Sequence, residues 1–221
     1  DGDILGLYKA GTAVGSIGTL SSQLTIGRGG VGLLFDNISS DAIEPHSMSA
    51  NAIRTDAINL GTSGSRFKDL YLSGGVYLGG TGAANKLSDY EEGSFNPIFT
   101  DNSGRAGTHA IQGGRYTRVG RVVNIQGYVV LSGLASMSGL VNLTGFPFAN
   151  INVTNGYSSV NVSLATGLAI TAGENLSATI VPNTTNAQMR LWDDAAGTTS
   201  LTTSELSSNG GFIFAATYIS T

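Results

Sequence analysis

The stretch LGTSGSRFKDLYLSGGVYLGGTGAANKLSDYEEG, residues 60–93, separates two parts of the chain that have different sequence patterns. Before it, apolar residues come in short groups broken by Gly, Ser or Asn. After it, longer segments are rich in β-branched and aromatic residues, which favour strands. Within it, residues 66–72 alternate and residues 76–78 read as one more short strand. Residues 86–92 resemble one or two turns of helix with Asn85 as the cap.

The composition favours an all-β protein with many tight turns. Gly accounts for 32 of the 221 residues, and charged residues for only 12%, which is about half the usual share. A disordered chain is usually charge-rich and poor in β-branched residues, which this chain is not.

The charge balance and the cysteine count exclude several classes of protein. The net charge is −4, so we predict no nucleic acid partner. No apolar run reaches the roughly 18 residues of a membrane helix, so we predict no membrane insertion. The absence of Cys rules out disulfide and thiolate chemistry. The chain begins at Asp1 without Met, and we therefore expect it to be a fragment.

The first part of the chain, residues 1–80, has too little apolar content per segment to form a core alone. Ordering a residue costs about 1–2 kcal/mol, which short apolar groups in one chain cannot offset. Several copies wound around a common axis would cover these apolar faces, and glycines would permit the close approach. We predict an intertwined β shaft. The alternative is an ordinary small β domain.

The second part, residues 94–221, predicts a β-sandwich of the jelly-roll type. Gly, Asn, Ser or Asp separates most of nine candidate strands: residues 95–100, 115–119, 122–131, 140–144, 158–165, 168–171, 176–181, 188–192 and 211–219. Residues 115–131 predict a hairpin that turns at Gly120. The expected inward side chains of this hairpin are Tyr116, Val119, Val123, Ile125 and Val129.

Residues 122–173 contain no Asp, Glu, Lys or Arg. A monomeric sandwich usually carries charge on its outer faces, where it discourages aggregation. A neutral outer face therefore indicates burial against sister subunits. Any part that remains exposed would offer Asn, Ser, Thr and Tyr, which suit neutral sugars. A solvated polar β surface describes the same residues equally well.

Residues 65–97, SRFKDLYLSGGVYLGGTGAANKLSDYEEGSFNP, resemble the junction between shaft and tip in bacteriophage tail fibre proteins. The likeness continues loosely through residues 114–133 and 143–148. It implies a fibre shaft (1–80), a joint with a short helix (81–93) and a receptor-binding tip (94–221). It also implies a homotrimer in an extracellular virion, a cell-surface polysaccharide or lipopolysaccharide as the ligand, and contact with other virion tail proteins through a missing N-terminal part.

The sequence predicts no enzyme and no catalytic, cofactor or metal site. Its two histidines, His46 and His109, lie far apart in the chain, and no G-x-S-x-G nucleophile elbow is present. Two isolated histidines cannot form a typical zinc site. Residues 27–32 match G-x-G-x-x-G, but a strand-like segment follows instead of the helix that a dinucleotide needs. Residues 101–103 read as a turn and not as a calcium loop.

The candidate glycan-binding residues are aromatic and polar residues beside turns: Trp192, Asp193, Asp194, Tyr157 and Asn155. An aromatic ring can stack on a sugar while carboxylates and amides bond its hydroxyl groups. The alternatives are core packing for the tryptophan and ordinary turn chemistry for the two acids.

We therefore expect host-surface recognition by a homotrimeric tail fibre tip. One alternative is a structural virion component that registers the trimer and has no receptor site. A less favoured alternative is a hydrolase or lyase that degrades capsule.

Overall fold

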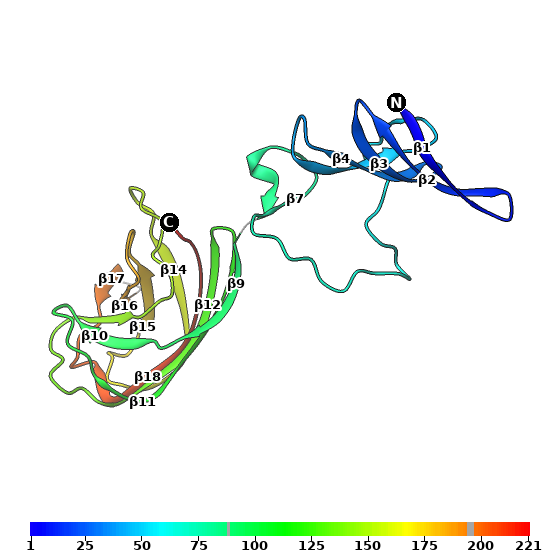
Figure 1. Ribbon diagram of the computed structural model, residues 1–221. Coiled ribbons are helices and arrows are strands. Elements are labelled where there is room, and N and C mark those ends of the chain that lie inside the picture. The colour runs from blue at the N-terminus through cyan, green and yellow to red at the C-terminus, as the bar shows by residue number, and fades with distance from the viewer. Residues whose placement is uncertain (88, 194–196) are drawn as a thin grey trace. The chain divides into compact units, whose positions relative to one another are not determined.

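The computed structural model describes residues 1–87, 89–193 and 197–221, and these residues form an all-β protein (Figure 1). The all-β prediction is therefore confirmed. The chain divides into two compact units, Asp1–Tyr71 and Leu72–Thr221.

The first unit is a six-stranded antiparallel sheet in which each strand pairs with its neighbour in the chain. Its strands are β1 (Gly2–Lys9), β2 (Thr12–Leu20), β3 (Gln23–Arg28), β4 (Val31–Asp36), β5 (Ala42–Ser47) and β6 (Ala52–Ile53). The glycine-rich match at residues 27–32 forms the hairpin turn between β3 and β4. Arg28 pairs with Val31 there, and Gly29 has a φ of +54°, which glycine adopts easily.

The two faces of this sheet reverse the usual distribution of side chains. In β3, Gln23 and Thr25 are buried, whereas the apolar residues between and after them point outward. Six large apolar side chains, each 37–65% exposed, share the outward face: Leu24, Ile26, Val31, Leu33, Phe35 and Ile43. We call these six residues the apolar face. A sheet that exposes apolar side chains over three adjacent strands is typical of a surface covered by a partner.

Asp36 anchors the inner face of the first unit. Its carboxylate accepts hydrogen bonds from the backbone N–H of Ser39 (3.0 Å) and Ile38 (2.9 Å), from the hydroxyl of Ser40 (2.7 Å) and from the amide of Gln23. The backbone N–H donors, followed by the Ser40 hydroxyl, lower the pKa of Asp36 from 3.8 to about 2, although burial opposes the shift. The charged form is therefore favoured in the folded state.

We expect the first unit to lose stability as the pH falls from about 4 to about 2. A folded-state pKa below the unfolded value contributes stability that is complete above the unfolded pKa and disappears as the folded group is protonated. Asp36→Asn should remove much of this acid dependence, whereas Asp3→Asn, at an exposed position, should not. Residue-resolved NMR amide signals during an acid titration would measure this. Identical acid transitions in the Asp36→Asn and unchanged proteins would contradict it.

The segment predicted to be a joint contains a hairpin. A 3-10 turn spans Ala83–Asn85, and the short strands β7 (Val76–Tyr77) and β8 (Lys86–Leu87) flank it. A helix was expected at residues 86–92, of which residue 88 lies outside the described residues. Lys86 and Leu87 instead form β8 in the hairpin that Asn85 closes, since its side-chain amide and its carbonyl bond the backbone of Leu78. Residues 90–92 instead begin a strand, Tyr90–Phe95, that pairs with residues of the second unit. Residues 66–72, which alternate in sequence, are not assigned to a strand.

The second unit is dominated by one ten-stranded antiparallel sheet that curls around a single core (Figure 1). The strand order is β10-β13-β16-β15-β14-β18-β12-β11-β9, with β17 beside β16. The strands are β9 (Tyr90–Phe95), β10 (Ile98–Asp101), β11 (Thr108–Val119), β12 (Val122–Gly133), β13 (Val141–Thr144), β14 (Ser158–Leu168), β15 (Asn175–Ile180), β16 (Ala187–Asp193), β17 (Gly197–Ser200) and β18 (Leu206–Ile219).

Most of the candidate strands are present in the second unit, with three differences. The strand β9 covers Tyr90–Phe95, where a helix was expected up to residue 92. Residues 168–171 do not form a separate strand, because Leu168 ends the long strand β14. The strand β17 was not predicted, since its sequence, GTTS, contains no large apolar residue.

The core of the second unit is built on aromatic contacts between strands that are distant in sequence. Phe99 and Phe212 pack edge to face with their ring centroids 5.2 Å apart. Val123, Ile125 and Val129 are fully buried, as predicted, and Tyr116 packs partly against the core.

The prediction for Val119 is wrong, since this side chain is 41% exposed. Val119 lies three residues after Tyr116 in the same strand, and side chains an odd number of residues apart point to opposite faces. The two residues therefore cannot both point inward.

Candidate functional site

The outward face of five adjacent strands in the second unit carries a continuous set of polar side chains. One row of paired residues crosses β9, β11, β12, β18 and β14 in order. It consists of Ser94, Arg115, Gln126, Ala215 and Asn161. All five residues are exposed. Because neighbouring strands lie about 4.8 Å apart, this row spans roughly 19 Å.

Further outward residues on the same strands, with Asn96 directly after β9, extend the row on both sides: Asn96, Thr117, Tyr128, Asn124, Thr217, Ile213, Ser159 and Ser163. We call these residues and the five of the row the polar face. They are mostly amides and hydroxyls, each of which can donate and accept hydrogen bonds. The alternation of the strands sends their apolar neighbours into the core.

The polar face is hollowed by three shallow depressions of about 470, 940 and 490 Å³. Arg115 and Gln126 line both the first and the second, and Asn161 lines both the second and the third. Gly113 lies in the largest depression, and a Cβ atom added there would meet no atom within 4 Å. The depressions fall within the volume range of small-molecule sites, although they are open to solvent.

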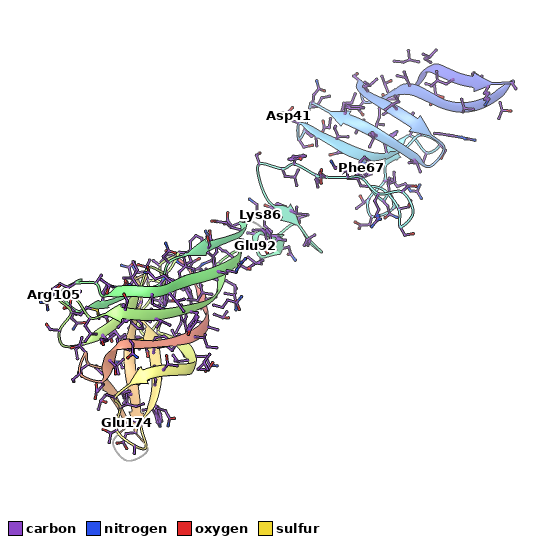
Figure 2. All side chains as sticks on the ribbon, turned by 90° about the horizontal axis from the view of Figure 1, so that it is seen from below. Asp41, Phe67, Lys86, Glu92, Arg105 and Glu174 are labelled. Carbon is purple, nitrogen blue, oxygen red and sulfur yellow. The ribbon has the colours of Figure 1, made fainter. Side chains whose placement is uncertain are left out.

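The polar face carries little charge. Arg115 is its basic residue, and the acidic Glu92 lies at its border in the first depression. Glu92 and Arg105 lie at opposite ends of the sheet (Figure 2). The charge-free stretch of residues 122–173 supplies the strands β12 and β14 of this face. The absence of charge marks this stretch in the sequence, but no local pattern reveals that Arg115 pairs with β9 and β12 beside it.

Trp192 is a surface side chain in β16 and is 53% exposed. It pairs with Asn175 on β15 and Thr198 on β17. On the same face of β16, two residues earlier, Arg190 donates a hydrogen bond to Ser200 (2.8 Å). The ring is therefore held on a polar surface and does not fill the core.

Asp193 follows Trp192 in β16 and pairs with Gly197. Adjacent residues of a strand point to opposite faces, so the acid and the indole ring do not share a face. The third residue of the predicted group, Asp194, lies outside the described residues.

Tyr157 and Asn155 lie in a loop before β14. Tyr157 is 58% exposed, and Asn155 adopts a φ of +62° in a turn closed by a hydrogen bond from Gly156 N to Val153 O (3.1 Å). The fully buried Asn150 ties this loop to the sheet, because its amide donates to the carbonyl of Gly156 (2.7 Å).

The structure does not bring Tyr157 and Trp192 together. Ser158, the next residue after Tyr157, pairs with Ile180 at one end of β15, whereas Trp192 pairs with Asn175 at the other end. Five residues of extended strand separate these positions, which is roughly 17 Å. Any ligand contacts by these two aromatic residues would therefore belong to different patches.

The two histidines and Asp101 are partly or fully buried within the protein. His109 accepts a hydrogen bond from the backbone N–H of Phe99 (3.0 Å), and burial lowers its pKa. His46 is buried in the first unit. Asp101 accepts hydrogen bonds from backbone groups of its own loop, from Arg105 and from Ser138. Burial raises the pKa of Asp101, but these donors outweigh it and the net shift is downward.

The described residues contain no group of three or more His, Cys, Asp or Glu side chains that could hold a metal ion. Within the same residues, no helix is long and apolar enough to cross a membrane.

Comparison with known proteins shows a similarity of fold to a solved structure, but no sequence match. No protein-family model matches the sequence, and no curated protein matches it. Among solved structures, the chain is similar to the Dettilon tailspike protein, with a TM-score of 0.51 and 20% sequence identity. The likeness covers 59% of this chain and 24% of the tailspike chain. At this level of identity the likeness is one of fold over the matched part of the two chains.

This likeness corrects the prediction that the chain is not an enzyme. The neighbour is a tailspike protein, so composition alone does not show that this chain lacks catalytic activity. That prediction rested on two histidines far apart in the chain and on the absence of a nucleophile elbow. It was unsound because residues that are distant in the chain can meet across a curled sheet.

Proposed function

We propose that this chain is part of a phage tail protein that binds a glycan of the bacterial surface through the polar face of its second unit. The observation that carries the proposal is the row of Ser94, Arg115, Gln126, Ala215 and Asn161 across five strands. It gives a hollowed surface lined with amides and hydroxyls.

The chemistry of the polar face suits sugars. Sugar hydroxyls both donate and accept hydrogen bonds, and so do the side chains of Gln126 and Asn161. Ala215 and Ile213 lie between these polar groups and offer apolar contacts for the CH groups of a sugar ring. Such a shallow, open site would bind one sugar segment weakly.

Several copies of the site would compensate for weak single contacts. We further propose that the first unit joins copies of the chain through its apolar face, in a homotrimer as the tail fibre resemblance implies. Interfaces between copies are more apolar than the remaining surface, which favours the apolar face over the polar face as the contact. Linked weak sites gain avidity without any new contact.

Trp192 and Tyr157 remain proposed secondary contacts. Each offers an exposed ring, and Trp192 has Asn175, Arg190 and Thr198 around it. Since their patches are separate, a long polysaccharide would have to extend from one to the other.

Binding of the full-length chain to a panel of purified bacterial polysaccharides of known structure tests the proposal. We expect the double variant Gln126→Ala, Asn161→Ala to lose at least tenfold in affinity, because two amides that bond the sugar are removed. Trp192→Ala serves as the matched variant at the second patch, and thermal unfolding checks that each variant folds. Reducing-sugar release from each polysaccharide that binds would detect hydrolysis.

Three outcomes distinguish binding at the polar face, binding at β16 and a purely structural role. Loss in the double variant supports the polar face as the site. Loss only in Trp192→Ala moves the site to β16. If the unchanged protein binds neither the polysaccharides nor bacterial cells, the glycan-binding proposal fails and a purely structural role for the chain is favoured.

A further inference from the structure

We infer that the glycan on the polar face is anionic, and that Arg115 binds its carboxylate or phosphate group. This inference rests on the proposed function, and it adds the chemical class of the ligand. It follows from the pairing state of the arginines in the second unit and from the position of Arg115 in the row.

The five arginines of the second unit differ in what they contact. Arg105 binds the carboxylate of Asp101 (2.7 Å). Arg118 donates to the carbonyl of Gly120 (2.9 Å), lies 3.9 Å from the carboxylate of Asp89 and stacks over Phe148.

The remaining two paired arginines also have defined partners. Arg121 donates to the carbonyl of Ser220 (3.2 Å), and Arg190 donates to Ser200 (2.8 Å) and Gln188. Within residues 1–87, 89–193 and 197–221, the side chain of Arg115 has no hydrogen bond and no ion pair. It is therefore the arginine whose donors are available to a ligand.

Arg115 also occupies a central position. It pairs with Ser94 on one side and Gln126 on the other, and it lines the two depressions of about 470 and 940 Å³. A guanidinium group presents its N–H donors in a planar fork that matches a carboxylate or a phosphate. Neighbouring amides can then bond the hydroxyl groups of the same sugar.

The nearest acid sets the side from which an anion would approach. Glu92 pairs with Thr117, so it is a diagonal neighbour of Arg115, at roughly 7–8 Å between backbone positions. Glu91 lies on the opposite face, where it accepts a hydrogen bond from Tyr116. An anionic group is therefore favoured on the side of Arg115 that faces Gln126 and Asn161, in the larger depression.

The test uses the full chain and a panel of polysaccharides, half of them uncharged and half carrying uronate or phosphate. We expect the unchanged protein to prefer the charged half, with an affinity that falls as salt is added. Arg115→Gln should weaken binding to the charged half at least tenfold, and Arg115→Lys should weaken it less. Glu92→Gln should strengthen it slightly. Arg66→Gln, which removes an equal charge at an exposed position of the first unit, should leave it unchanged.

The results distinguish this inference from the proposed function. If the protein binds only uncharged polysaccharides, or if Arg115→Gln binds the charged ones as tightly as the unchanged protein does, the inference is overturned while the proposed function stands. If Arg66→Gln weakens binding as much as Arg115→Gln does, the effect is one of general charge and the inference is again overturned. If no polysaccharide binds, the proposed function itself has failed.

Discussion

The double variant Ile26→Ser, Leu33→Ser is expected to have the solution mass of one 22.6 kDa chain, whereas the unchanged protein is expected to have the mass of three. These two residues pair with each other in the middle of the apolar face. Fully burying a Leu or Ile side chain contributes about 1.5–3 kcal/mol. Two replacements in each of three chains therefore remove roughly 9–18 kcal/mol at most from the assembly.

Light scattering of purified protein measures this result. Leu140→Ser is the matched control, because it replaces an apolar side chain of similar exposure (40%) in the second unit. It should leave the mass unchanged. A monomeric unchanged protein, or a double variant that keeps the assembled mass, would contradict the proposal that the apolar face joins copies of the chain. Circular dichroism would show that the double variant retains its strands.

Phe212→Ala is expected to lower the free energy of unfolding of the second unit by about 3–5 kcal/mol. Phe212 is fully buried and contacts both Phe99 and Phe214. It also lies on β18, whose next residue, Ile213, points outward into the polar face. Loss of this side chain should therefore loosen β18, one of the five strands that form the candidate site.

Thermal and urea unfolding measure this effect, and we expect the melting temperature to fall by about 10 °C for a unit of this size. Tyr157→Ala, a truncation of an exposed aromatic ring, is the matched control and should change the stability by less than about 0.5 kcal/mol. Equal stabilities of the two variants would show that the aromatic cluster does not hold the sheet.

The sequence was sufficient to predict the class of fold and most of the strands in the second unit. Alternating apolar residues, as in β12 with Val123, Ile125 and Val129, report which side of a strand is buried. Turn residues mark where strands end. Both signals are local, so they can be read without knowing which strands are neighbours. The same locality explains the failure at residues 86–92, where the hairpin closed by Asn85 and the pairing of β9 with β11 override a short helical pattern.

The candidate site was decided by the tertiary structure. Ser94, Arg115, Gln126, Ala215 and Asn161 form one row only because β18, at the end of the chain, pairs with both β12 and β14. The apolar face likewise depends on the register of β3, β4 and β5. Strand composition predicts that a strand exists, but the choice of partner and register comes from burying one common core, to which residues from the whole unit contribute. For this reason the sequence indicated the exposed, uncharged strands, and only the structure placed Arg115 among them.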